Sequence, residues 1–249
     1  MDFDSAKRVF EEYLDGYDRE NDKVRLKIVH TYGVAAQSTA IAERMRLSAE
    51  DRELAQIIAL LHDIGRFEQL RQFDSFWPET MDHASYGVEL LFGTSRMIRK
   101  FVPEDKWDEV IRVAIAKHSD FALEGISDER KLMHARIIRD ADKLDNCRVK
   151  LEDDFEAFLG VPAEKVSSSV ITRKVREDAL AGRSILSSDR VTPMDYWVSY
   201  LVYFYDLNYR ASLDIVEEND YVRRLIRRIP YLDPDTGRVM EELENRLIK

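Results

Sequence analysis

Histidine and aspartate residues recur along this chain in a pattern that could hold metal ions. The protein contains only five histidines, and four of them belong to the series. Imidazole nitrogens and carboxylate oxygens are the ligands that borderline and hard divalent cations prefer, so the series predicts a metal site and metal-assisted chemistry. Its members are His30, the adjacent pair His62-Asp63, His83, His118 and Asp142.

The spacing of apolar residues predicts that these side chains point into a helical interior. His62 lies four residues after Ile58, and His118 lies four after Ala114, so each continues the apolar stripe of its helix. Because Gly65 closely follows the His-Asp pair, we expect a glycine turn that presents both side chains to one cavity. The same inward spacing holds for His83 and Asp142.

The fifth histidine, His134, is the natural contrast. A single histidine on an apolar helix face is more often a hydrogen-bonded core residue than a metal ligand. His134 lies eight residues before Asp142, which is about 12 Å along a helix and too far for the two to share an ion. We expect a structural or surface histidine.

Composition predicts an all-α protein with one compact domain. The 249 residues include only 9 Gly and 6 Pro, and no Pro/Gly/Ser-rich linker divides them. We predict a core over 22–146 and a helical extension over 147–249. The expected helices cover 5–16, 22–46, 50–62, 82–93, 104–118, 128–146, 149–158, 164–181, 192–209, 211–228 and 235–248.

The charge balance restricts the partners. The chain has 38 Lys+Arg against 48 Asp+Glu, a net charge of -10, which argues against duplex nucleic acid or a membrane as a partner. A small anionic substrate remains compatible because bound cations reverse the local field. The single cysteine, Cys147, and an N-terminus without the apolar core of a signal peptide favour a cytoplasmic protein. The sequence makes no prediction of the oligomeric state.

Together these residues resemble the HD-domain superfamily of metal-dependent phosphohydrolases, whose defining pattern is H…HD…D on an all-helical fold. The resemblance covers residues 30–145, and the later helices are similar to the extension that such proteins often carry. It implies that His30, His62, Asp63 and Asp142 are the defining ligands. The segments that carry it are LHDIGRF at 61–67, DHA at 82–84, KHSD at 117–120 and IIRDADKLD at 137–145.

His83 and His118 extend the pattern to six ligands, a set similar to those of HD-GYP phosphodiesterases and bacterial diadenosine tetraphosphate hydrolases. This resemblance implies two divalent transition-metal ions, manganese or iron, with nickel, cobalt, zinc or magnesium as alternatives. Asp63 would bridge the ions, with His83 and His118 completing the second site. In the mononuclear alternative, His83 and His118 line the substrate pocket instead.

Arg66 stands where several binuclear HD families carry a lysine that faces the substrate phosphate. The resemblance therefore implies a bidentate phosphate clamp, and the alternative is a surface cation near a helix end. Asp63 and Arg66 are the predicted catalytic residues.

The neighbours of the ligands provide further candidates. Lys143 and Asp145 are predicted to contact the substrate, and the alternative for both is to support a metal ligand. Asp140 is an alternative to Asp142. Candidates of the same kind near His83 are Asp74 and Asp82.

The resemblance implies a phosphohydrolase that cleaves a phosphomonoester or phosphodiester of a small nucleotide-like anion through metal-activated hydroxide. Arg66-Phe67 replaces the acidic residues of the HDxxED alarmone hydrolases and the HDxxE nucleotidases, which counts against both subfamilies. Two alternatives share the ligand set, namely an HD-fold di-iron oxygenase and a non-catalytic metal-binding regulatory module.

Overall fold

Helices and the loops between them make up the described part of the chain. The structure, a computed structural model, describes residues 1–77 and 79–248, and it contains no strand in these ranges, which confirms the all-α prediction. No helix within them is long and apolar enough to cross a membrane. Contacts divide the chain into two compact units, Met1–Asp145 and Asn146–Lys249. This boundary lies next to the predicted division between core and extension. That the two parts form a single domain stays a prediction.

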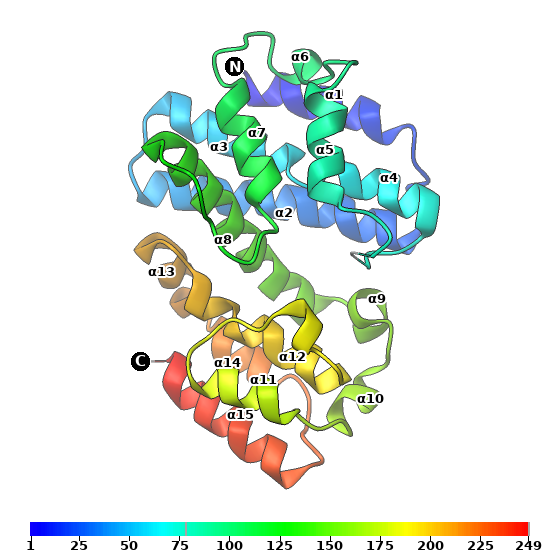
Figure 1. Ribbon diagram of the computed structural model, residues 1–249, viewed down its shortest axis with the longest axis vertical. Coiled ribbons are helices and arrows are strands. Elements are labelled where there is room, and N and C mark those ends of the chain that lie inside the picture. Colours follow the sequence, from blue (N-terminus) through cyan, green and yellow to red (C-terminus); the bar gives the residue numbers. More distant parts are fainter. Residues whose placement is uncertain (78, 249) are drawn as a thin grey trace. The chain divides into compact units, whose positions relative to one another are not determined.

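The first unit contains the helices that carry every predicted ligand (Figure 1). Within it α2 packs against α3 and α4, α4 packs against α5, and α5 packs against α7. Fully buried side chains such as Ile57, Leu61 and Ile111 form its core. The helices are α1 (Phe3–Leu14), α2 (Asp22–Arg44), α3 (Ala49–Leu61), α4 (Ile64–Phe73), α5 (His83–Phe92), α6 (Ile98–Phe101), α7 (Asp108–Lys117) and α8 (Glu129–Glu152), which continues past the unit boundary.

Side-chain caps fix where the helices of the first unit begin. The Asn21 side chain accepts backbone N–H bonds at the start of α2, and Ser48 does so at the start of α3. Asp82 accepts the backbone N–H of Ser85 and so places His83 at the first position of α5. Capping is therefore the role that the structure gives Asp82.

The His62-Asp63 pair lies at a junction between two helices. His62 is the C-cap of α3, and Asp63 is the N-cap of α4, with a carboxylate that makes no capping bond. The predicted glycine turn is wrong, because Gly65 lies inside α4. A Cβ at Gly65 would overlap the backbone oxygen of His83, so this glycine allows α4 and α5 to approach closely.

The second unit contains the end of α8 and the remaining helices. α12 packs against α10, α11 and α14, and both α11 and α14 pack against α15. The predicted helix over 211–228 is broken into α13 and α14, because Asp220 adopts a left-handed conformation with φ 49°. The elements are α9 (Phe155–Leu159), α10 (Ala163–Ser167), α11 (Arg173–Leu180), η1 (Ser187–Asp189), α12 (Pro193–Leu201), η2 (Val202–Asp206), α13 (Arg210–Glu218), α14 (Tyr221–Ile226) and α15 (Pro234–Leu247).

Candidate metal centre

The first group of predicted ligands meets between α2, the α3–α4 junction and α8. Ligand atoms of His30, His62 and Asp63 all lie within 4.8 Å of one another, and the three side chains are buried. Asp142 borders them, with its Oδ1 2.9 Å from Nε2 of His30 and 3.9 Å from Nε2 of His62. We call these four residues the first group.

The second group consists of Asp63, His83 and His118. Asp63 Oδ1 lies 3.3 Å from Nε2 of His83 and 3.6 Å from Nε2 of His118, and the two nitrogens are 3.1 Å apart. The other oxygen, Oδ2, lies 3.6 Å from Nε2 of His62 in the first group. Each oxygen of Asp63 therefore faces a different group.

The donor atoms of both groups fit divalent cations. Ligand atoms about 2.1 Å from one ion are separated by roughly 3.0–3.5 Å, close to the spacings described above. The Nδ1 atoms of His62 and His118 each donate to a backbone oxygen at 2.7 Å, of Ala59 and Ile115 respectively. These bonds direct both Nε2 lone pairs into the cluster. Nε2 of His62 is buried without a hydrogen-bond partner in the described part of the chain, as expected of a metal ligand.

Asp145, which is predicted to contact the substrate, lies behind His30. Its Oδ2 accepts a hydrogen bond of 2.7 Å from Nδ1 of His30, and Asp145 is 1% exposed. Gly33 makes room for it, because a Cβ at that position would overlap Oδ1 of Asp145. This bond orients His30, which is one of the two roles predicted for Asp145, and the substrate contact stays a prediction.

Two cationic side chains lie next to Asp63. Nζ of Lys27 is 2.5 Å from Oδ2 of Asp63, and Nε of Arg66 is 3.6 Å from Oδ1. Arg66 Nη1 donates to Oε1 of Gln69 at 2.7 Å and to the backbone oxygen of Phe76 at 3.1 Å. Arg66 is thus held at the cluster and is no surface cation. Lys27 was not predicted, although it lies one helical turn before His30 on α2.

Burial and neighbouring charges set the protonation of most of the cluster. Burial lowers the pKa of His62 to about 4 despite the charge of Asp63. Burial and the charge of Arg66 lower the pKa of His83. Burial raises the pKa of Asp63, but the charges of Lys27 and His62 outweigh it and place that pKa well below the usual value. At neutral pH these groups therefore have the protonation states that bind metal.

His30 differs in its pKa from His62 and His83, because its Nε2 lies 2.9 Å from Oδ1 of Asp142. Burial and the Lys27 charge lower the pKa of His30, but the hydrogen bonds to Asp142 and Asp145 outweigh them and the net pKa is raised. Burial raises the pKa of Asp142, yet its bond to His30 and the charge of His30 bring it below the usual value. A proton held on His30 would be released when a metal ion binds.

Arg139 on α8 holds the chain around His118, and no sequence pattern near Arg139 indicates this role. Its Nη1 donates to the backbone oxygens of His118 at 3.3 Å and of Asp120, and its Nη2 donates to that of Phe121 at 3.3 Å. These carbonyls lie at and beyond the end of α7, where no further helical N–H groups are available to bond them. Arg139 therefore fixes the last turn that positions His118.

The remaining predicted residues take different places. Lys143 is half-buried on α8, next to Asp142, and its substrate contact stays a prediction. Asp74 is exposed and pairs with Lys23 at 2.7 Å. His134 is buried with its Nε2 3.1 Å from Asp51, so it is a structural histidine. Asp140 is fully buried, and Asp142 is the aspartate whose carboxylate borders the first group.

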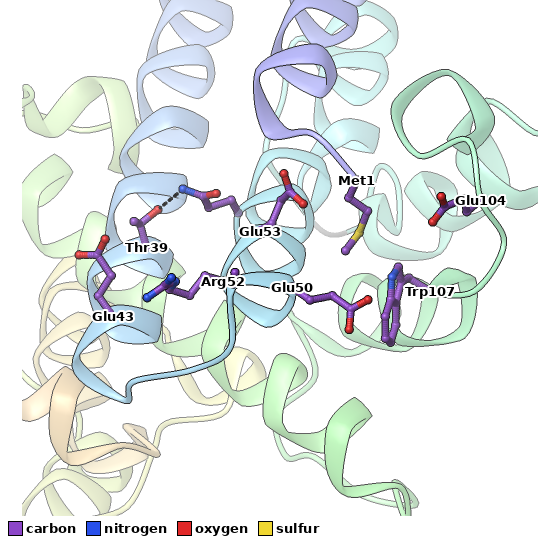
Figure 2. Close-up of a pocket in the computed structure, with 10 residues that line it drawn as sticks. Met1, Thr39, Glu43, Glu50, Arg52, Glu53, Glu104 and Trp107 are labelled. Carbon is purple, nitrogen blue, oxygen red and sulfur yellow. Dashed lines mark hydrogen bonds between the residues drawn. The ribbon is translucent and has the colours of Figure 1, made fainter.

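A pocket of about 490 Å³ lies elsewhere in the first unit, with Trp107 and Met1 on one side (Figure 2). None of its lining residues belongs to either group. Its negative charge is unfavourable for an anionic substrate, so we do not assign the active site to it. The carboxylates that line it are Glu43, Glu50, Glu53 and Glu104.

Comparison with known proteins agrees with the geometry. Residues 28–147 match the family model described as HD domain, and this range includes both groups. No curated protein and no solved structure matches the chain. HD-domain proteins are generally metal-dependent hydrolases that bind divalent metals and act on phosphorylated small substrates. The resemblance inferred from the ligand pattern is confirmed, and the chain carries, over residues 28–147, an HD domain of the metal-dependent phosphohydrolase superfamily.

Proposed function

We propose that this protein is a metal-dependent phosphohydrolase that cleaves a phosphomonoester or phosphodiester of a small nucleotide-like molecule. The observation that carries the proposal is the position of Asp63, whose two oxygens face two buried histidine groups while Lys27 and Arg66 lie beside it. Metal-binding atoms adjacent to fixed cations are what phosphoryl transfer requires, because its transition state spreads negative charge over the non-bridging oxygens.

The first group would hold one divalent ion and the second group another. Manganese or iron is the proposed metal, with nickel, cobalt, zinc and magnesium as alternatives, because His/Asp ligand sets distinguish these ions poorly. When bound, such ions lower the pKa of water towards about 7 and so supply hydroxide near neutral pH. The ligands of the first site are His30, His62, Asp63 and Asp142, and those of the second are Asp63, His83 and His118.

Arg66 would bind the phosphoryl oxygens. Its Nη1 is already engaged by Gln69 and Phe76, while its Nε is buried, faces Asp63 and makes no hydrogen bond within the described residues. The predicted bidentate clamp would therefore use the edge that carries Nε. Because Gln69 is fully buried and also donates to the backbone oxygen of Trp77 at 2.9 Å, the guanidinium is oriented before substrate arrives.

The test begins with metal analysis of protein purified without chelator. We expect about two transition-metal ions per chain, the number that the two groups predict. The loaded protein is then assayed for phosphate release from nucleoside monophosphates, dinucleotides and bis(4-nitrophenyl) phosphate, with and without oxygen. Arg66→Ala should keep its metal and lose affinity for these substrates, and His134→Gln serves as a matched control outside the cluster.

Each other outcome selects another function. Activity that requires both iron and oxygen would identify an oxygenase. Full metal content without turnover of any substrate would favour a regulatory module. No bound metal after reconstitution would reject the proposal.

A further inference from the structure

Lys27 is a charged residue of the cluster to which the ligand pattern assigns no role. It lies on α2 three residues before His30, so both side chains project from the same face of the helix. Its side chain is 14% exposed, and its ammonium group is 2.5 Å from Oδ2 of Asp63. Because solvent screens this ammonium group only weakly, its charge interacts strongly with the other charged groups of the cluster.

The oxygen that Lys27 contacts is the one that faces the first group. Oδ2 of Asp63 lies 3.6 Å from Nε2 of His62, whereas Oδ1 faces the second group. An ion held by His62 and Oδ2 would therefore lie close to the Lys27 ammonium. Two cations in a poorly solvated site repel each other, so binding of the ion favours withdrawal of the ammonium from Asp63.

The Lys27 ammonium already has a second partner beside Asp63. The ring centroid of Phe76 lies 5.6 Å from its Nζ, a distance at which an aromatic face attracts a cation. The backbone oxygen of Phe76 accepts a hydrogen bond from Arg66, so Phe76 also borders the proposed phosphate clamp. The flexible four-carbon stem of lysine would let the ammonium leave Asp63 and stay over this ring without movement of the backbone.

We propose that Lys27 neutralises Asp63 while the first site is empty and binds the phosphoryl group of the substrate once an ion is present. This role rests on the proposed phosphohydrolase function. Lys27 and Arg66 would then contact the phosphoryl group from the two sides of Asp63. The same lysine would weaken metal binding at the first site and strengthen phosphate binding, a combination that a purely structural anchor for Asp63 would not produce.

The experiment measures two affinities by titration calorimetry, without any assay of turnover. Mn²⁺ alone is titrated into metal-free protein, and inorganic phosphate is titrated into Mn²⁺-loaded protein. Lys27→Met removes the charge and keeps most of the volume, and Lys27→Arg keeps the charge. Lys23→Met is the matched control, since Lys23 lies one turn earlier on α2 and pairs with the exposed Asp74.

In Lys27→Met we expect Mn²⁺ to bind the first site about tenfold more tightly and phosphate to bind at least about tenfold more weakly, the size of one charge-assisted hydrogen bond. Lys27→Arg should retain phosphate binding, and Lys23→Met should match the wild type in both titrations. Circular dichroism and thermal melting check that each variant is folded, and Lys27→Gln replaces the Met variant if that one is not.

Weaker Mn²⁺ binding with unchanged phosphate affinity in Lys27→Met would overturn the proposal and leave Lys27 as an anchor for Asp63. Unchanged values in both titrations would also overturn it, while the phosphohydrolase proposal would stand. A wild-type protein that binds no Mn²⁺ would instead reject the proposed function itself, and this role with it.

Discussion

The two groups that share Asp63 differ in charge and in what supports them. The first group contains a second carboxylate, Asp142, and a third carboxylate, Asp145, bonds to Nδ1 of His30. The second group contains no carboxylate other than Asp63, and Arg66 lies beside it. Negative charge around a site favours a cation, whereas Lys27 opposes an ion at the first site and Arg66 opposes one at the second. Because the two additional carboxylates at the first group outweigh the one lysine, we expect the first site to bind its ion more tightly.

The groups also differ in the elements that carry them. The first group draws His30 and Asp142 from the interiors of α2 and α8, helices of 23 and 24 residues. The second group draws His83 from the first position of α5 and His118 from the C-cap of α7, helices of 10 residues each. Helix ends depend on caps and on neighbouring segments, so the geometry of the second site should be easier to disturb.

The largest effect on metal binding and activity is expected from a change at Asp63, the ligand that both groups share. Asp63→Ala removes the carboxylate that both groups share, and it should lose both ions and lower phosphohydrolase activity by at least about a thousandfold. Elemental analysis and an activity assay measure the two effects. A variant that retains one ion would show that one group does not depend on Asp63.

His118→Ala should separate the groups. It removes a ligand of the second group alone, so the metal content should fall from about two ions to about one, and the remaining ion should keep its affinity. Titration with Mn²⁺ would show one binding step in place of two. Loss of both ions would mean that the groups form a single cooperative site.

Low pH should destabilise the metal-free protein, because His62 stays neutral in the folded state. The unfolded chain takes up a proton near the ordinary pKa of 6.5, while the folded protein does so only near about 4. The unfolded state therefore binds more protons in this window, and stability falls as the pH is lowered from about 6.5 towards 4, with His62 contributing on the order of 3 kcal/mol. Urea unfolding as a function of pH measures this, and His62→Asn should show a shallower slope. Equal slopes would mean that His62 does not bring this cost.

Asp145→Asn tests the support of the first group. The amide keeps the shape of the side chain but removes the charge behind His30, so the first ion should bind about 10- to 100-fold more weakly. The affinity of the second site should not change. Gly33→Ala on α2 tests the same support, because the added Cβ would displace the Asp145 carboxylate. This variant should also bind the first ion more weakly. Weaker ion binding at the second site alone would contradict the proposal that Asp145 supports the first group.

The sequence predicted the ligands better than the residues that position them. His62 and His118 are set by helical spacing within their own segments, and periodicity detects that. The contact between Gly33 and Asp145 depends instead on how α2 and α8 pack, and nothing local to either residue indicates it. Arg139 likewise acts on carbonyls at the end of another helix. Lys27 did have a local signal, because it lies one turn before His30.

The errors in the predicted helices have the same origin. The sequence predicts a glycine turn at Gly65 and no helix over 64–73, whereas the close packing of Gly65 against His83 keeps this glycine inside α4. The opposite error occurred at 164–181, where one predicted helix is the pair α10 and α11. Local propensity gave the all-helical class correctly, and tertiary packing decided where individual helices begin and end.

The smallest expected effect concerns the support of the second group. Arg139→Met leaves every ligand in place but removes the donors to the backbone oxygens of His118, Asp120 and Phe121. The last turn of α7 then loses its side-chain partners, and the carbonyls must find water instead. We expect the second ion to bind less than about tenfold more weakly, with the first ion unaffected, because hydrogen bonds that orient a ligand change affinity less than the ligand itself does. Mn²⁺ titration measures both steps, and Arg139→Lys should fall between the variant and the wild type since one ammonium group cannot reach all three carbonyls. If Arg139→Met weakened the first ion instead, the two groups would be coupled through α8, and the difference in support between them would lose its basis.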